Sequence, residues 1–371
     1  MSHVRALLTL SCVIFLLTSV VTATACGGLF CQNIPVDQQS ERIIFTVNKD
    51  NTITAYVQIN YTGSAPDFSW VVPVPSVPKV DVAEKTSFDE LSNLTSPIFI
   101  PPLMPECAAI PVPMVALAGG SVDDSSVQVL ASGVAGPYAY DVITSEFPTE
   151  LIIWLRTNNY RITEEMEPLI KVYTDEKMVF LAMKLRPEKG AQDIQPVVMT
   201  YAGTHPMIPL RLTAVAANPN MNVVTWILGD GQAVSTNYAH PTINDDDLRY
   251  SFGSSDGTNY LSLVDQTVDL YNGRAFITEY AMPTRELEQQ VSDPLVKKLL
   301  ATNPYITRVF GRISPEEMTV DPTFILQSDL INVSNVRDLS KMDAKTFWSC
   351  EGTDQNVQVE YEAWAVPEGF K

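Results

Sequence analysis

Residues 42–61, RIIFTVNKDNTITAYVQINY, carry the clearest structural signal in this chain of 371 residues. In the second half of the stretch apolar side chains alternate with polar ones, and a period of two is typical of a strand with one buried face. The alternating apolar residues are Ile53, Ala55, Val57, Ile59 and Tyr61. Residues 42–47 form a second apolar run, and the polar segment at 48–51 separates the two as a turn does. The stretch predicts an antiparallel hairpin against a hydrophobic core.

Strand and helix patterns follow this hairpin along most of the chain. Strand patterns lie at residues 68–72, 127–130, 138–144, 178–185, 196–201, 210–217, 223–228, 275–280, 306–313, 324–327 and 357–364. Helical patterns lie at residues 87–94, 149–157, 258–271 and 293–300, and another begins at 163. Prolines and glycines crowd residues 97–126, which predicts a linker or a surface loop.

These patterns predict a β-rich α+β protein. We expect an N-terminal antiparallel β-sandwich-like unit at residues 26–96, followed by a sheet-plus-helices unit at residues 127–371. The two units are expected to be separate or to share one core. Prolines number 26, which favours short elements joined by many turns.

The first residues predict export from the cytoplasm. Arg5 precedes an apolar run at residues 6–21, and the small residues Ala23 and Ala25 flank Thr24 at its end. A basic start, a short apolar stretch and a small-residue cleavage site are typical of a secretory signal peptide, here residues 1–25. We therefore expect an extracytoplasmic protein: periplasmic, secreted or on the cell surface. No later apolar run is long enough for a transmembrane helix.

The cysteines agree with an oxidising environment. Cys12 lies in the predicted leader, and four cysteines follow it: Cys26, Cys31, Cys107 and Cys350. Four cysteines in an exported chain indicate disulfides with three possible connectivities. We favour Cys26–Cys31 and Cys107–Cys350. Lipidation of Cys26 is the weaker alternative, because a lipoprotein signal usually has leucine where this chain has Ala23.

The formal charge of −19 argues against nucleic-acid binding and raises the possibility of a calcium site. A chain this acidic does not bind nucleic acid through a basic face. Asp245, Asp246 and Asp247 are weak candidates for a calcium site, because Ca²⁺ prefers clustered oxygen ligands. The triplet does not match an EF-hand, since Tyr250 stands where glycine is required. A solvated acidic turn is the favoured interpretation.

No motif in the chain supports a particular catalytic chemistry. Residues 253–257, GSSDG, match the serine-hydrolase elbow, but the last histidine is His240 and the fold of that elbow needs one after the serine. His205 and His240 both precede proline and are expected in loops, without the spacing of a zinc site. The sequence therefore names no catalytic and no cofactor-binding residue.

Several short strings together resemble one known family. They are ACGG at 25–28 with Cys31, FSWVVPVP at 68–75, GPY at 136–138, WL at 154–155 with NY at 159–160, PLRL at 209–212, TR at 307–308, SPEEM at 314–318 and DP at 321–322. In this order they resemble the exported bacterial proteins grouped as domain of unknown function family 2330. The resemblance implies a bacterial, exported protein and supplies no activity, cofactor or catalytic residue.

Taken together, these features favour a non-catalytic binding or structural module of the bacterial envelope, with an unidentified partner. Two alternatives stay open. One is an extracytoplasmic hydrolase whose carboxylates converge only in the fold, which predicts a concave site with two acidic side chains. The other is a calcium-dependent adhesion module.

Overall fold

The computed structural model describes residues 38–59, 68–103, 129–250 and 257–343. The protein is a β-rich α+β protein, as the sequence predicts. Its largest sheet has the strand order β12-β13-β10-β1-β2-β9-β4. These strands are β1 (Gln38–Val47), β2 (Thr52–Ile59), β4 (Lys79–Val82), β9 (Val197–Ala202), β10 (Ala217–Gly229), β12 (Ile277–Pro283) and β13 (Tyr305–Ile313). Strands from before and after residues 97–126 thus share one sheet.

The predicted hairpin lies at the centre of this sheet. Strands β1 and β2 pair antiparallel, with Ile43 opposite Val57 and Phe45 opposite Ala55. The turn closes with the amide of Asn48 donating to the carbonyl of Thr52 at 2.9 Å. Asn51 has a φ of 59°, a conformation that asparagine tolerates better than most residues. The other edge of β1 pairs parallel with β10, so β1 is an interior strand.

A four-stranded sheet packs on one face of β1 and β2. Its order is β3-β8-β7-β6, formed by β3 (Ser69–Val74), β6 (Val129–Ala135), β7 (Tyr138–Ile143) and β8 (Val179–Leu185). Trp70 and Val72 of β3 belong to the same buried cluster as Ile43 and Phe45 of β1. Pro73 lies in β3, which is an edge strand, where the missing amide hydrogen costs no ladder bond.

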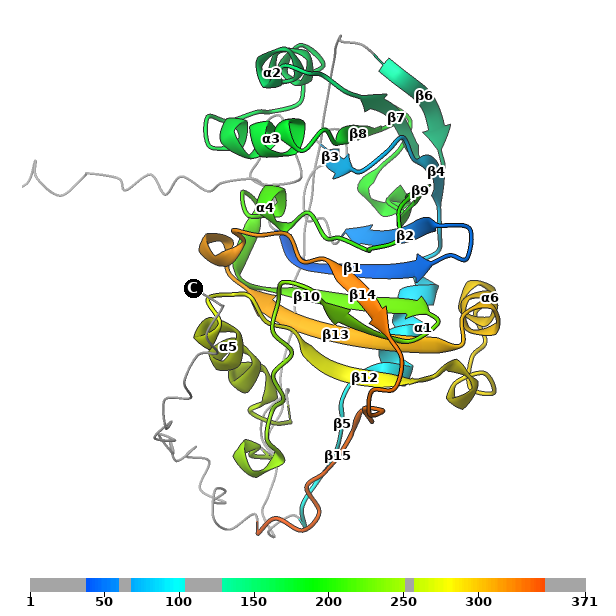
Figure 1. The fold of residues 1–371 in the computed structure, drawn as a ribbon, viewed down its shortest axis with the longest axis vertical. Coiled ribbons are helices and arrows are strands. Elements are labelled where there is room, and N and C mark those ends of the chain that lie inside the picture. The colour runs from blue at the N-terminus through cyan, green and yellow to red at the C-terminus, as the bar shows by residue number, and fades with distance from the viewer. Residues whose placement is uncertain (1–37, 60–67, 104–128, 251–256, 344–371) are drawn as a thin grey trace, which may run out of the picture.

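Helices cover the two outer faces. Helices α2 (Pro148–Thr157) and α3 (Met166–Asp175) form a second buried cluster against the far side of the four-stranded sheet. On the other side of the large sheet, Phe88 of α1 (Thr86–Thr95) lies edge-on to Trp226 of β10. Helix α5 (Tyr260–Leu270) lies beside β13. The remaining helices are α4 (Leu210–Thr213) and α6 (Pro294–Thr302). The layers follow as helices, sheet, sheet, helices (Figure 1).

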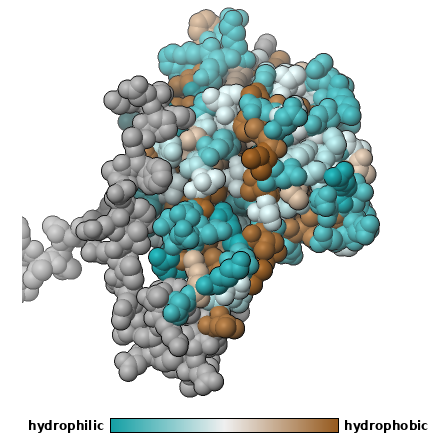
Figure 2. All heavy atoms as spheres, turned by 60° about the horizontal axis from the view of Figure 1, so that its bottom comes forward, coloured by the Kyte–Doolittle hydropathy of each residue, from teal (hydrophilic) through white to brown (hydrophobic). Residues whose placement is uncertain are grey.

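Two small ribbons complete the described fold. Strands β11 (Gln232–Ser235) and β14 (Phe324–Gln327) pair antiparallel, and β5 (Ile98–Ile100) pairs parallel with β15 (Val336–Asp338). The β5–β15 ribbon lies at the lower end of the molecule in Figure 1, and the view that brings this end forward shows apolar patches among hydrophilic ones (Figure 2). In the described residues, no helix has the length and hydropathy needed to span a membrane.

A buried ion pair ties the helical layer to the large sheet. Arg308 Nε of β13 lies 2.5 Å from Glu279 Oε2 of β12, and the hydroxyl of Tyr260 donates to Glu279 Oε1 at 2.7 Å. The register of β12 shifts at Glu279, and such a bulge can redirect a side chain. The Arg308 guanidinium lies 5.3 Å from the ring centroid of Trp226. On the face of the large sheet that α1 and α5 cover, the buried charges of Glu279 and Arg308 thus neutralise each other.

The structure differs locally from the sequence patterns. The strand predicted at residues 210–217 is α4 followed by the start of β10, because a short apolar run fits either a buried strand or a buried helical turn. The short strands β4, β5, β11 and β15 were not predicted. The helix predicted at residues 87–94 is α1, whose N-cap is Lys85. The hydroxyl of Ser87 in its first turn donates to Asp293 Oδ1 at 2.9 Å.

Candidate functional site

Three of the strings that carry the family resemblance meet beside the packed sheets. The string at 68–75 contributes β3, the string at 209–212 contributes α4, and the string at 321–322 precedes β14. Pro209, directly before α4, lines a cavity between the two sheets together with Pro73 and Pro75. We call the polar contacts of Arg211 and Asp321 the Arg211 clamp, and the cavity beside it the Glu41 cavity.

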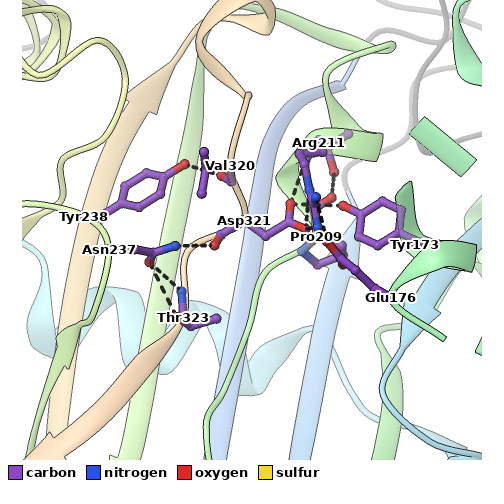
Figure 3. Close-up of polar contacts among 10 residues, drawn as sticks. Tyr173, Glu176, Pro209, Arg211, Asn237, Tyr238, Val320, Asp321 and Thr323 are labelled. Atoms are coloured by element: carbon purple, nitrogen blue, oxygen red, sulfur yellow. Dashed lines mark hydrogen bonds and ion pairs between the residues drawn. The ribbon is translucent and has the colours of Figure 1, made fainter. Parts of the chain in front are cut away.

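The Arg211 clamp joins α4 to the segment before β14 (Figure 3). The buried carboxylate of Asp321 accepts the backbone amide of Arg211 at 2.9 Å and the side-chain Nε at 2.8 Å. A second guanidinium nitrogen lies 2.6 Å from Asp321 Oδ2. The same guanidinium donates to both carboxylate oxygens of Glu176, at 2.9 and 2.8 Å. Such two-point contacts fix the direction of arginine as well as its charge.

Helix α3 and the loop after β11 hold the clamp from two sides. The hydroxyl of Tyr173 on α3 donates to Asp321 Oδ1 at 3.0 Å, and the Arg211 guanidinium lies 4.6 Å from the ring centroid of Tyr173. Asn237 donates to the backbone carbonyl of Asp321 at 2.8 Å and accepts the amide of Thr323 at 3.0 Å. Residues far apart in the sequence thus converge on one carboxylate.

The electrostatics of the clamp fix its protonation. Burial alone would lower the pKa of Arg211, but its hydrogen bonds to Glu176 and Asp321 raise the pKa above its usual value. Burial, followed by the charge of Asp321, raises the pKa of Tyr173. Arg211 therefore stays charged and Tyr173 stays a hydrogen-bond donor. Neither can exchange a proton near neutral pH, so the clamp is suited to holding structure.

The Glu41 cavity lies between β1, β2, β9 and β3. Its volume is about 30 Å³, and its lining is apolar except at Glu41 and Tyr201. The side chain of Glu41 is 5% exposed, and its Oε2 has no hydrogen-bond partner among the described residues. Burial raises the pKa of Glu41 to about 7. A ligand pocket for a small molecule is at least about ten times larger, so this cavity does not admit a substrate.

A third place gathers acidic side chains at the surface. A cleft of about 400 Å³ is lined by Asp81, Glu84, Ser87, Asp293 and Tyr56, among others. Asp293 is the N-cap of α6 and accepts the amides of Leu295 and Val296. Burial would raise the pKa of Asp293, but these bonds and the hydroxyls of α1 lower it. Asp293 is therefore a structural acceptor and not a proton donor.

The acidic triplet predicted as a weak calcium site forms a short 3₁₀ turn, with Asn244 as its cap. Asp245 pairs with Arg337, and the carbonyl of Asp246 accepts from Arg249 at 2.6 Å. Within residues 38–59, 68–103, 129–250 and 257–343, no group of three or more His, Cys, Asp or Glu side chains is arranged to hold a metal ion. Calcium binding by Asp245, Asp246 and Asp247 stays a prediction.

The two histidines lie in loops, and their surroundings differ. His205 is exposed. His240 Nε2 accepts the amide of Ser235 at 2.7 Å, and its Nδ1 lies 3.2 Å from the hydroxyl of Thr278. Burial lowers the pKa of His240 to about 4, so the ring is neutral and serves as a structural link.

Other predicted residues lie outside the described part of the chain. These are Cys26, Cys31, Cys107, Cys350 and the serine of the GSSDG string at 253–257. The clamp and the cavity were not predicted from the sequence. The sequence held one signal for Glu41, which is that it alternates with Ile43 and Phe45 and therefore shares their face of a strand. Arg211 and Asp321 had no signal beyond the family strings.

Comparisons with known proteins give a family and no activity. A family described as "Uncharacterized protein conserved in bacteria (DUF2330)" matches residues 20–325. No curated protein matches the chain. Among solved structures, a mutated baculovirus P35 after caspase cleavage is similar over 81% of this chain and 99% of that one, with 9% identity and a TM-score of 0.31. A likeness this weak carries no argument about fold or function.

The clamp generates a prediction about two buried tyrosines. Tyr173 donates to a carboxylate, whereas Tyr238 donates to the carbonyl of Val320. Because bonds to charged groups are worth more, Tyr173→Phe should cost about 1.5–3 kcal/mol in unfolding free energy and the matched Tyr238→Phe about 0.5–1.5 kcal/mol. Urea unfolding measures both costs. In an Asp321→Asn background the cost of Tyr173→Phe should shrink, and equal costs in both backgrounds would contradict the clamp.

Proposed function

The chain belongs to DUF2330, a family of uncharacterised proteins conserved in bacteria, and on that premise we propose that it is an exported, disulfide-stabilised envelope module that binds a partner or holds structure without catalysis. The observation that carries this proposal is the Arg211 clamp. The three guanidinium nitrogens of Arg211 bind carboxylates, and Asp321 accepts from Arg211 and Tyr173. In the Arg211 clamp, the charged groups are therefore bonded to one another.

Export and disulfides are supported by the sequence and by one feature of the fold. The leader at residues 1–25 favours transport across a membrane. Strands β5 and β15 pair parallel, with Ile98 beside Val336 and Ile100 beside Asp338. The chain therefore leaves both strands at the same end of the ribbon, toward Cys107 and Cys350. Cys107 lies four positions after Leu103 and Cys350 lies seven positions after Asp343, a reach of about 14 and 24 Å when extended.

A second candidate function rests on the acidic cleft. Hydrolysis of sugars uses two carboxylates in a concave site, and Asp81 and Glu84 line a cleft of about 400 Å³ beside Asp293. Because Asp293 is held as an N-cap, Asp81 and Glu84 are the pair available for such chemistry. Against this candidate, Glu84 accepts the side-chain amide of Gln195 and Asp81 accepts the amide of Val82.

The proposal predicts the state of the cysteines in cells. When the full chain is produced with its leader and fractionated, we expect an extracytoplasmic protein that begins near Cys26. Non-reducing peptide mapping should show Cys107 linked to Cys350, and Cys107→Ser should lower the unfolding free energy by about 4 kcal/mol. Cys12→Ser is the matched control, because Cys12 is removed with the leader. An uncleaved cytoplasmic chain with reduced thiols would overturn the proposal.

A second experiment tests whether the acidic cleft hydrolyses glycosides. We expect no turnover when the purified protein is incubated with a panel of nitrophenyl glycosides. If turnover occurs, Asp81→Asn with Glu84→Gln should reduce it by about 10²–10⁴-fold, and the exposed Asp329→Asn should not. Turnover lost in that double variant would replace the proposed function by the hydrolase.

A further inference from the structure

Glu41 is a charged residue type in a place where the described residues offer it no charge partner. It is the first cavity-lining residue of β1, opposite Val223 of β10 and Ile59 of β2. The alternation of β1 places it on the inner face with Ile43 and Phe45, whereas Arg42 lies on the opposite face and pairs with Asp89 of α1. The nearest arginine along the chain is therefore on the wrong side of the sheet to neutralise it.

The elements packed around the cavity supply almost no titratable group. Strand β2 contributes Ala55 and Val57. Strand β3 contributes Trp70, Val72 and Pro73, and Pro75 follows it. The segment before α4 contributes Met207 and Pro209. Strand β9 contributes Met199 and Tyr201, and burial raises the pKa of Tyr201, so this phenol stays neutral. Among the described residues, the cavity has no cation facing Glu41.

An unpaired carboxylate in such surroundings is costly. Transfer of an isolated charge into an apolar interior is so unfavourable that the group takes up a proton instead. The volume of about 30 Å³ holds about two water molecules, which can solvate a neutral acid but only partly a carboxylate. The closed arrangement of the two sheets therefore favours the protonated side chain.

We propose that Glu41 is a proton-binding site built into the interface between the two sheets, and that release of its proton loosens the packing of β1 against β3. On release the carboxyl O–H bond breaks and the proton passes to solvent water. The carboxylate then draws water into the cavity, and the apolar contacts of Trp70 and Val72 weaken.

The direction of the pH effect follows from the two states of Glu41. The carboxyl has an ordinary pKa of 4.5, and burial raises it to about 7 in the folded protein. Between these values the folded protein keeps a proton that the unfolded chain has lost, so stability falls as pH rises through this window. Below and above the window Glu41 adds no further pH dependence. The full shift corresponds to about a 300-fold change in the folding equilibrium constant.

Glu41→Gln tests this proposal, because it keeps the size of the side chain and removes the proton equilibrium. Urea unfolding from pH 4 to pH 8 should show the variant gaining stability relative to the wild type across the window and staying level above pH 7. The matched control is Glu288→Gln at an exposed position, which should give a constant difference. A constant difference for Glu41→Gln as well would overturn the proposal.

A second measurement reports on packing rather than on stability. With 5-fluorotryptophan in place of tryptophan, the resonance of Trp70, assigned by its loss in Trp70→Phe, should shift with an apparent pKa near 7. In Glu41→Gln that shift should disappear while the other tryptophan resonances are unchanged. A Trp70 resonance that titrates identically in both proteins, or in neither, would contradict loosening at the cavity.

Discussion

The structure depends on the face-to-face packing of β1 and β2 against β3. Burying Ile43, Phe45 and Val57 on one side and Trp70 and Val72 on the other removes several large apolar side chains from water, each worth about 1.5–3 kcal/mol. Helices pack on the outer faces of both sheets, so the position of all four layers depends on this one contact. A polar group buried in this interface must therefore be hydrogen-bonded, paired with an opposite charge, or neutral.

Two buried acidic side chains near this interface, Asp321 and Glu41, are stabilised in different ways. At the clamp, Asp321 is paired with Arg211 and further bound by Tyr173, so its charge is compensated. In the neighbouring cavity, Glu41 faces no cation among the described residues, so burial favours its neutral form and raises its pKa to about 7. The first arrangement holds α3 and α4 against the segment before β14 through paired charges, although burial raises the pKa of Asp321. The second makes the contact between the sheets depend on a proton.

The hairpin, the fold class and most helices were predictable because their signals are local. Alternation in β2, the Asp293–Pro294 start of α6 and the apolar face of α5 each lie within one element. Strand pairing across the chain was not predictable, because β1 pairs with β10 about 180 residues later. The clamp joins Tyr173, Arg211 and Asp321 from three separate segments, and no spacing in the sequence reveals that convergence. Residues 210–217 were mistaken for a strand because their four buried positions fit the strand period of two as well as the helical period of 3.6.

If the Arg211 clamp stabilises the fold where the family strings meet, then Arg211→Met should lower the free energy of unfolding. Removing the guanidinium leaves Asp321 buried and unpaired, so the account predicts a loss of about 3–5 kcal/mol, with much of it recovered when Asp321 is also replaced by a neutral residue. An Arg211→Met protein as stable as the wild type would contradict the account.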